Sequence, residues 1–387
     1  MAAWALAGAG VAATKAWSAL CSAALGLPLA APLAVSGVAH AQATALPEST
    51  EVSVKYLAYD DAQPGQDRVK VLATSTLITA PIQERWILNA GYIIDAISGA
   101  SPAYHSSGMV HFTDKRRAGD LELTHVGDRM SVAAGLSLSE ESDYIGRGAA
   151  LKVARWTEDK NTTWTAGVSV SNDSVEPNNG KVDRQAKQLK SALVGVTQVL
   201  SRYDLLQVNL GQSEGRGYLS DAYKIYDERP SARTLRSVAL RWNHHFPQWG
   251  STLRTSYRLT LDSWSIRTQT YSMEWVLPVA EGHTVSPLLR WYTQSAASFY
   301  QDAGPPGLPF PPNPPAGAVH YAQDQRLSAF GSASLGARWV YRFSPTLSFD
   351  LKLERAEQHG DWKPGGGSPG LPKFVIRVAQ AGVTARF

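Results

Sequence analysis

Cysteine is nearly missing from this sequence, which contains a single one, Cys21, among 387 residues. A chain with one thiol cannot be a small secreted module that is held together by disulfides. Because Cys21 lies in a segment that we expect to be removed on export, the mature protein would contain no thiol. It therefore needs no oxidising compartment to fold, and it cannot use cysteine as a nucleophile.

Charged residues are also scarce. They make up 18% of the chain, below the about 25% that is usual for soluble domains. The net charge is +4 without any block of Lys or Arg, so we expect no nucleic acid partner. A mean hydropathy of −0.20 is too low for a bundle of transmembrane helices. The 12 Trp and 15 Tyr exclude a disordered chain.

Acidic residues are absent from residues 1–43, where the one basic residue is Lys15. An apolar stretch follows Lys15 and ends in two A-x-A triplets, the pattern of a secretory signal peptide. We expect residues 1–43 to be a signal peptide that is cleaved after Ala41 or Ala43. A transmembrane anchor is the alternative, and two prolines and the small residues at the end of the stretch disfavour it.

The rest of the chain alternates apolar and polar residues with a period of two. Clear examples are residues 130–139, 163–171, 252–262 and 347–354. Since successive side chains of a strand point to opposite faces, each window has one apolar and one polar face. A soluble β-sandwich would show the same alternation, so other features must separate the two folds.

Three features favour a membrane barrel. The windows are often roughly ten to fifteen residues long, whereas globular strands average about 5–6 residues and membrane strands need about 9–11. Aromatic residues such as Trp86, Trp242, Trp275 and Trp339 lie near the window ends on the apolar face, as in interfacial girdles. The chain ends in an alternating strand whose last residue, Phe387, resembles the signal that the outer-membrane barrel-assembly machinery recognises.

The connections point the same way. About sixteen strands can be counted, an even number as bacterial barrels require. With a periplasmic N-terminus, all connections expected in the periplasm are short, and the long ones are expected outside, at residues 98–114, 172–184, 212–232, 298–325 and 358–371. We therefore expect an all-β chain, in which residues 44–387 form a transmembrane antiparallel up-and-down β-barrel in the outer membrane of a Gram-negative bacterium.

The polar face of the strands would line the barrel interior. We expect Arg241, Arg254, Arg258 and Arg290 on four nearby strands, with Glu274 among them, as one charged wall of an aqueous channel. The full set of candidate lining residues is Arg241, Arg254, Arg258, Asp262, Glu274, Arg290, Arg338 and Asp350, and we expect Lys70 and Arg155 on the same face. Three interiors remain open: a water-filled pore, an interior filled by salt bridges, and a specific ligand cavity.

Nothing in the sequence indicates catalysis. It contains no G-x-S-x-G and no phosphate-binding loop, and no nucleophile–base pair can be proposed. Four histidines are expected in or beside external loops, but their spacing matches no short metal motif: His105, His111, His320 and His359. We expect no enzyme, no cofactor and no metal.

Residues 95–102, with the sequence Asp-Ala-Ile-Ser-Gly-Ala-Ser-Pro, read as a strand that enters a turn of small residues. Asp95, Ser98 and Ser101 are its polar side chains. We expect the Asp95 carboxylate to accept hydrogen bonds from the turn backbone, with cation binding as the alternative.

This segment resembles a recurring motif of an uncharacterised family of bacterial outer-membrane β-barrel proteins, which is known only as a domain of unknown function. The other resembling segments are Glu141-Ser142-Asp143-Tyr144, Asp227-Glu228-Arg229-Pro230 with Arg233, and Tyr257-Arg258 followed by residues 262–266. The resemblance spans essentially the whole mature chain and implies an outer-membrane barrel, but it supplies no activity. Members look to be encoded beside thioredoxin-like and flavin-transfer proteins, which implies a link to an envelope redox system.

Two functions follow from these expectations. The leading hypothesis is passive or weakly selective passage of small polar solutes through an Arg-rich lumen. The alternative is a non-conducting structural or scaffold barrel whose external loops bind a partner. In both cases the chain would contact outer-membrane lipids and would be inserted by the barrel-assembly machinery through Phe387.

Overall fold

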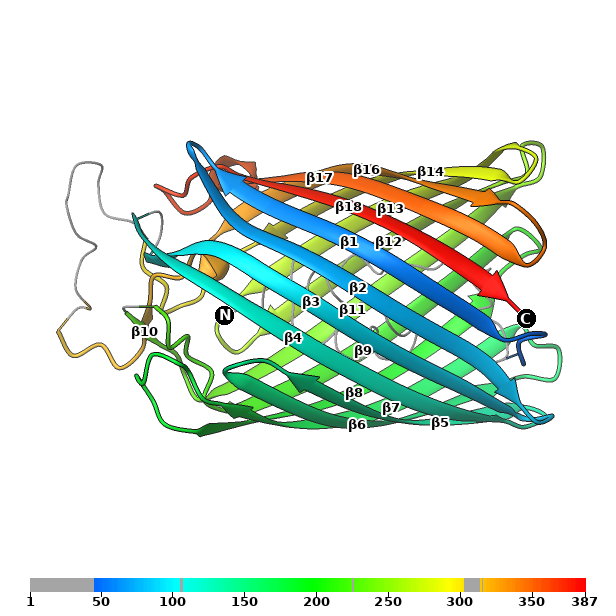
Figure 1. Cartoon of the computed structure of the whole chain (residues 1–387), viewed down its shortest axis with the longest axis horizontal. Coiled ribbons are helices and arrows are strands. Elements are labelled where there is room, and N and C mark those ends of the chain that lie inside the picture. The colour runs from blue at the N-terminus through cyan, green and yellow to red at the C-terminus, as the bar shows by residue number, and fades with distance from the viewer. Residues whose placement is uncertain (1–44, 105–106, 225, 303–313, 315) are drawn as a thin grey trace.

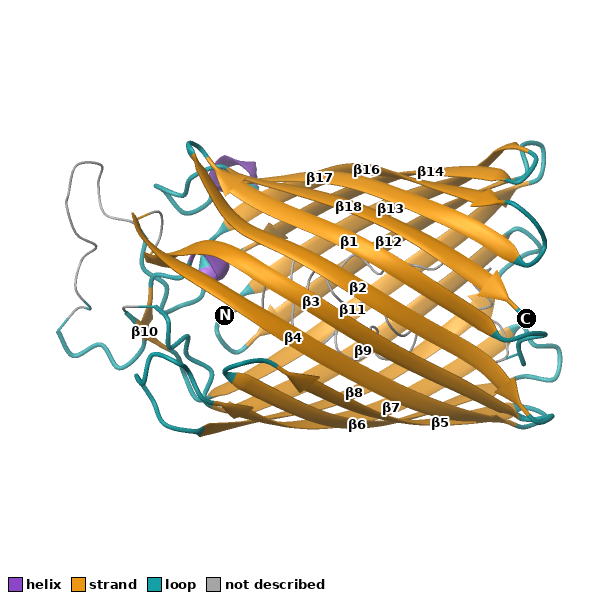
Figure 2. Cartoon of the chain, in the orientation of Figure 1, coloured by secondary structure: helices purple, strands orange, loops and turns teal. Residues whose placement is uncertain are grey.

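The computed structural model describes residues 45–104, 107–224, 226–302, 314 and 316–387, so the expected signal peptide lies outside the described residues. Sixteen strands form one closed antiparallel barrel (Figures 1 and 2), which confirms the predicted fold and strand number. The strands follow one another around the barrel in chain order, and the first pairs with the last to close it. Among the described residues, no helix has the length and apolarity that crossing a bilayer requires.

The elements have the following bounds. The barrel strands are β1 (Glu51–Gln63), β2 (Gln66–Ile82), β3 (Trp86–Tyr104), β4 (Ser107–Val126), β5 (Met130–Glu140), β6 (Tyr144–Trp156), β7 (Thr162–Val175), β8 (Gln185–Val199), β9 (Asp204–Gly217), β11 (Ala232–Phe246), β12 (Ser251–Asp262), β13 (Arg267–Ala280), β14 (His283–Gln294), β16 (Phe330–Arg342), β17 (Leu347–His359) and β18 (Phe374–Arg386). Outside the barrel, β10 (Asp227–Glu228) pairs with β15 (Tyr321–Ala322), and η1 (Gln325–Leu327) and η2 (Gly360–Trp362) are 3-10 turns.

The outer face of the barrel is apolar, as the alternation predicts. Large side chains on it are left exposed, for example Leu136 at 64%, Val194 at 54% and Leu335 at 67%. Aromatic residues gather on this face near the end with the short turns, where Trp339, Tyr341 and Phe343 contact one another. An apolar band of this kind, edged with aromatic rings, is suited to contact with lipid.

The two ends of the barrel differ. Short turns join the strands at the end where β18 terminates, and the long connections lie at the other end, which we call the outer end (Figure 1). One short turn depends on Gly282, whose φ is +72° and whose Cβ would lie 2.8 Å from the carbonyl oxygen of Arg342. The predicted segregation of short and long connections is therefore confirmed.

Two predicted loops are wrong in extent. Residues 98–104 and 107–114 are ladder rather than loop, because β3 and β4 stay paired out to Tyr104 and Ser107. In the same way, β9 continues to Gly217 before the long connection begins. Small residues and Pro102 suggest a turn locally, but in a hairpin each backbone group finds a partner across the ladder, and tertiary pairing overrides the local preference.

The inner face is not polar throughout. Near β1–β3 and β17–β18 it carries a buried apolar cluster, which consists of Leu57, Tyr59, Val69, Val71, Ala73, Ile97, Ala356, Phe374 and Ile376. Leu57 alternates with the exposed Tyr56 of the outer face, so the cluster points into the barrel. This part of the interior is therefore filled by side chains.

Candidate functional site

The predicted arginines lie on the inner face, on three strands rather than the expected four. Arg241 comes from β11, Arg254 and Arg258 from β12, and Arg290 from β14. In the ladder, Arg241 faces Ser256, which faces Ser272, which in turn faces Arg290. One row across this wall is therefore Arg–Ser–Ser–Arg, in which hydroxyl side chains separate the cations. We call these four arginines, with Glu274 of β13, the cationic wall.

Positive charges dominate the cationic wall. Arg254 donates to Glu274, with 3.2 Å between Nη1 and Oε2. Arg241 lies within electrostatic range of Arg254, Arg258 within range of Arg241, and Arg290 within range of Arg258. The nearest acidic groups are Glu274, within range of Arg241, and Glu354 of β17, within range of Arg290. Arg241 is exposed although it points inward, and no carboxylate of the described residues lies within 4.0 Å of it. The wall therefore presents positive charge to water inside the barrel.

The neighbouring stretch of the inner face, on β5–β9, has small side chains. Its members are mostly glycine, serine, threonine and alanine, among them Ser131, Ala133, Gly135, Ser137, Thr163, Thr165, Gly167, Ser169, Ser191, Gly195 and Thr197. Small residues on the inner side of a barrel leave space in its lumen. We call this stretch the small wall.

Arg338 and Asp350 belong to a different part of the interior, the ion-paired sector of β16, β17 and β1. Asp350 lies 3.5 Å from the Nζ atom of Lys55 and 3.6 Å from Nη2 of Arg338. Lys352 and Glu354 pair at 2.7 Å. Arg338 is 8% exposed and Asp350 is 4% exposed. These two predicted residues therefore fill the barrel instead of lining open space.

Three residues that were predicted to point into the barrel do not face the lumen: Asp262, Lys70 and Arg155. Asp262 ends β12 at the outer turn, where it accepts hydrogen bonds from Arg233 and from the backbone N–H of Trp264 and Ile266. Its role is to hold that turn, which fits its place in the resembling motif.

Lys70 and Arg155 were predicted on the wrong face and are exposed on the outer one. On β2 the buried Val69 and Val71 point inward, so the apolar face there is the inner face and the pattern is reversed. Arg155 pairs with Trp164 across the ladder near the end with the short turns, where the membrane interface tolerates a cation.

The predicted turn at Asp95, Ser98 and Ser101 is also wrong, because all three lie within β3. Asp95 is buried on the inner face and accepts a hydrogen bond from Nε of Arg116 at 2.9 Å, its direct partner in the ladder. Ser98 is exposed on the outer face, and the Ser101 side chain lies outside the described residues.

The outer mouth carries a structure that the sequence did not reveal. Parts of the connections 218–231 and 295–329 fold together around Asp324, which accepts hydrogen bonds from Arg229 and Arg326. Arg326 also pairs with Asp221. Burial raises the pKa of Asp324, but Arg326, Lys224 and Arg229 together hold this pKa well below its usual range. We call the described parts of these two segments, with their buried ion pairs, the outer cap.

Apolar contacts and the positions of its charges hold the outer cap across the mouth. Its buried apolar residues pack with Trp264 and Ile266 of the β12–β13 turn: Leu219, Ala297, Phe299, Tyr300, Ala322 and Leu327. Arg229 lies within electrostatic range of Lys187 on β8, and Asp324 within range of Arg68 on β2. The cap is also bonded to two separate parts of the rim, since Gln294 of β14 donates to the backbone carbonyl of Arg326 and Tyr223 donates to Asp143 between β5 and β6. It therefore bridges the opening.

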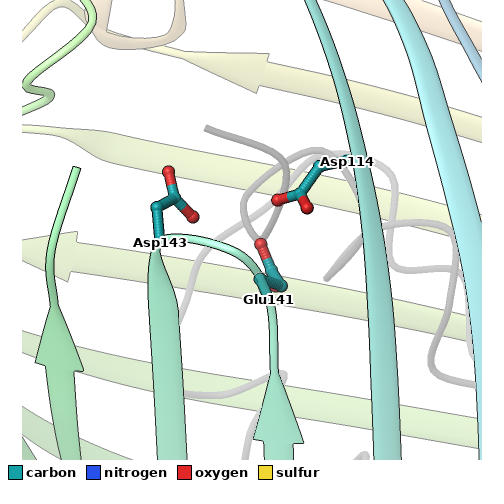
Figure 3. A group of neighbouring side chains, drawn as sticks. All are labelled: Asp114, Glu141 and Asp143. Carbon is teal, nitrogen blue, oxygen red and sulfur yellow. The ribbon is translucent and has the colours of Figure 1, made fainter. Parts of the chain in front are cut away.

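An acidic cluster borders the outer cap. Carboxylate oxygens of Asp114, Glu141 and Asp143 lie within 4.8 Å of one another, and Figure 3 shows Glu141 directed between the other two. Asp143 accepts a hydrogen bond from the Tyr223 hydroxyl of the cap at 2.5 Å. Burial raises the pKa of Glu141 to about 7. Carboxylates are the ligands that Ca²⁺ and Mg²⁺ prefer, so these three are the described residues that could hold a metal.

Comparisons with known proteins agree with this architecture. The model of a family described as "Protein of unknown function (DUF3570)" matches residues 17–109, 105–190 and 179–371. No curated protein matches the chain. The matched segments contain all the motifs on which the family resemblance was based, and the resemblance is confirmed.

Solved outer-membrane barrels have a similar fold. A bacterial polysaccharide outer membrane secretin is 10% identical with a TM-score of 0.50, over 88% of this chain and 98% of that one. The CymD monoaromatic hydrocarbon channel is 11% identical with a TM-score of 0.46, over 88% and 89%. A Pseudomonas aeruginosa FadL homologue is 13% identical with a TM-score of 0.43, over 87% and 90%. At such identities the likeness concerns the fold alone.

Proposed function

The chain belongs to the DUF3570 family of proteins of unknown function, and from this premise we propose that it is an outer-membrane channel for small polar solutes, with a preference for anions. The observation that carries the proposal is the cationic wall, in which four arginines and one glutamate share the inner face and Arg241 is exposed there. Charged side chains that line a pore decide which ions pass. Guanidinium groups also match carboxylate and phosphate in shape. The wall would therefore bind organic anions as well as repel cations.

The shape of the interior supports passage. Barrels of sixteen strands are wide enough for an aqueous channel, and the small wall next to the cationic wall leaves part of that width free. The ion-paired sector and the apolar cluster fill the remaining part. Solutes would therefore move along the side of the barrel that β5–β14 form, in contact with arginine on one flank and with hydroxyl groups on the other.

The location is part of the proposal. The chain would be exported by its N-terminal signal, and its apolar outer face would contact outer-membrane lipids. The barrel-assembly machinery would read the last strand, whose terminal Phe387 is 79% exposed while its backbone pairs with Thr50. The proposal gives the chain no enzymatic step.

Current recordings test the proposal. The purified barrel, in planar bilayers under a KCl gradient, should give ohmic steps with a reversal potential that favours chloride. Arg241→Gln combined with Arg258→Gln should move this potential toward zero. Arg155→Gln is the matched control, because it removes a cation from the outer face. A barrel that migrates as folded on a gel before heating, yet carries no current, would refute the channel.

A second candidate is favoured by the outer cap. A mouth that is spanned by two packed segments with buried ion pairs is also what a non-conducting scaffold would show. Such a barrel would present the cap to a partner in an envelope redox system. A silent but folded barrel would leave this candidate in place.

A further inference from the structure

Several cations on the outer face of the barrel lie toward its outer end. Arg117 of β4, Arg147 of β6, Lys190 of β8 and Arg236 of β11 are all exposed on this lipid-facing side. They alternate with apolar residues that face outward too, such as Leu121 and Val194. A charge in this position is not explained by the lumen or by the outer cap. We call these four residues the basic belt.

The basic belt lies at one level along the barrel. The last residues of these four strands at the short-turn end are Val126, Trp156, Val199 and Phe246. Each belt residue lies nine positions before the last residue of its strand, except Arg236, which lies ten positions before it. At about 3.3 Å per residue and a tilt of about 40°, this distance is about 23–25 Å along the barrel axis. The apolar band of outer-membrane barrels is about 25 Å tall. The belt therefore lies at the level of the lipid headgroups on the outer side.

No member of the basic belt forms an ion pair with a described residue, although Glu140 faces Arg117 and Glu214 faces Lys190 across the ladder. None of its four side chains has a carboxylate of the described residues within 4.0 Å. Glu214, which faces Lys190 in the ladder, pairs with Arg216 instead.

The other half of the outer face differs. Three of its cations have a carboxylate partner: Lys70 pairs with Asp67 at 3.2 Å, Arg355 with Glu357 at 2.6 Å, and Arg377 with Asp60 at 3.2 Å. The absence of partners is therefore not a property of outward cations in general.

We propose that the basic belt binds the phosphate groups of an acylated, doubly phosphorylated glycolipid in the outer leaflet. The belt residues come from every second strand of the barrel, and strands are about 4.8 Å apart, so neighbouring cations are separated by about 10 Å. Two phosphates on one sugar headgroup can bridge such a pair, while the acyl chains lie along the apolar residues below. The long Lys and Arg stems cover apolar surface and place their charges at the headgroups. The inference rests on the proposed outer-membrane location but not on conduction.

Lipid binding to the whole folded barrel tests this inference. Purified lipid A, phosphatidylglycerol and phosphatidylcholine are titrated into the protein in detergent, and bound lipid is counted by native mass spectrometry. Wild type should retain lipid A in preference to the other two. R117Q/R147Q/K190Q should bind lipid A about tenfold or more weakly, since each basic group near a charged lipid surface contributes to attraction.

The chain offers a matched control. K70Q/R355Q/R377Q also removes one lysine and two arginines from the outer face, but from positions with carboxylate partners, and it should bind lipid A as wild type does. Gel migration before and after heating shows that both variants are folded.

Equal binding of lipid A and phosphatidylglycerol by wild type, or equal loss in both triple variants, would overturn the inference. Current is recorded separately in phosphatidylcholine bilayers without lipid A, so a silent channel and an unbound glycolipid are independent results.

Discussion

The ion-paired sector and the cationic wall are two stretches of the same inner face, and both are rich in charge. In the first, Asp350 lies between Lys55 and Arg338, and all three are buried. In the second, Glu274 pairs with Arg254, while Arg241 remains exposed to the lumen. Removing a charge from water without a partner costs several kcal/mol. A counter-charge on the adjacent strand therefore decides which stretch can be packed and which stays in contact with water.

This difference separates structural charge from charge that is available to a solute. The ion-paired sector satisfies its own cations, so it offers little to a passing anion. The arginines of the cationic wall repel one another across neighbouring strands, and an anion in the lumen would relieve that repulsion. The same residue types thus have different consequences on two sides of one barrel.

The strongest way to break the comparison is to remove the shared carboxylate of the ion-paired sector. Asp350→Asn should lower the free energy of unfolding by about 3–5 kcal/mol, because Lys55 and Arg338 would remain buried without a counter-charge. Urea unfolding of the barrel in lipid vesicles measures the change. Glu274→Gln is the matched substitution in the cationic wall and should cost about 1 kcal/mol or less. Equal losses in the two variants would contradict the distinction.

The next effect concerns access to the cationic wall. Asp324→Asn removes the carboxylate that joins Arg229 and Arg326 in the outer cap, and the current through the barrel should rise several-fold. Because the pKa of Asp324 is depressed, its stabilising contribution is present above the pKa of an unfolded aspartate and is lost only as pH falls through the folded value. Wild-type current should therefore stay constant between about pH 5 and 8. Glu228→Gln, an exposed change on the same connection, is the control. An unchanged current in the Asp324 variant would show that the cap does not limit passage.

A smaller change should convert one region into the other. Ser256→Glu places a carboxylate next to Arg241, its partner in the ladder, and so imitates the ion-paired sector. We expect a weaker preference for chloride, together with a gain of about 0.5 kcal/mol in the free energy of unfolding. Ser256→Gln adds nearly the same volume without charge and should leave the reversal potential close to that of wild type. If both variants shift the potential equally, bulk rather than charge controls selectivity.

The last prediction concerns a charge outside the membrane. Burial raises the pKa of Glu141 from its ordinary value of 4.5 to about 7. The protonated form therefore adds stability that is fully present below about pH 4.5, and this stability is lost as pH rises through about 7. Unfolding measured at pH 5 and pH 8 should show this loss in wild type but less of it in Glu141→Gln. The same pH dependence in both proteins would assign the effect to another group.

Some parts of the lumen could be predicted from the sequence and others could not. The inward direction of Arg241, Arg254, Arg258 and Arg290 follows from alternation alone, and the structure agrees. The error at Lys70 arose because β2 turns its apolar residues inward, which a rule that assigns apolar residues to lipid cannot foresee. The turn expected at Asp95 failed because ladder pairing with Arg116 outweighs a local preference for small residues.

The outer cap and the acidic cluster had only a weak signal in the sequence. Asp227-Glu228-Arg229-Pro230 and Glu141-Ser142-Asp143-Tyr144 were recognised as segments that resemble a family, without any role. Their contacts join residues that are far apart in the chain, such as Arg229 with Asp324 and Tyr223 with Asp143. No spacing rule connects such positions.

The sequence by itself determined the barrel, its number of strands, its apolar outer face and the asymmetry of its two ends. These properties depend on a period of two and on the lengths of connections, which are local. Only the tertiary structure decided which charges are paired, what spans the outer mouth and which outward cations share one level. Those properties depend on strand register and on the closure of β1 against β18, which bring distant residues together.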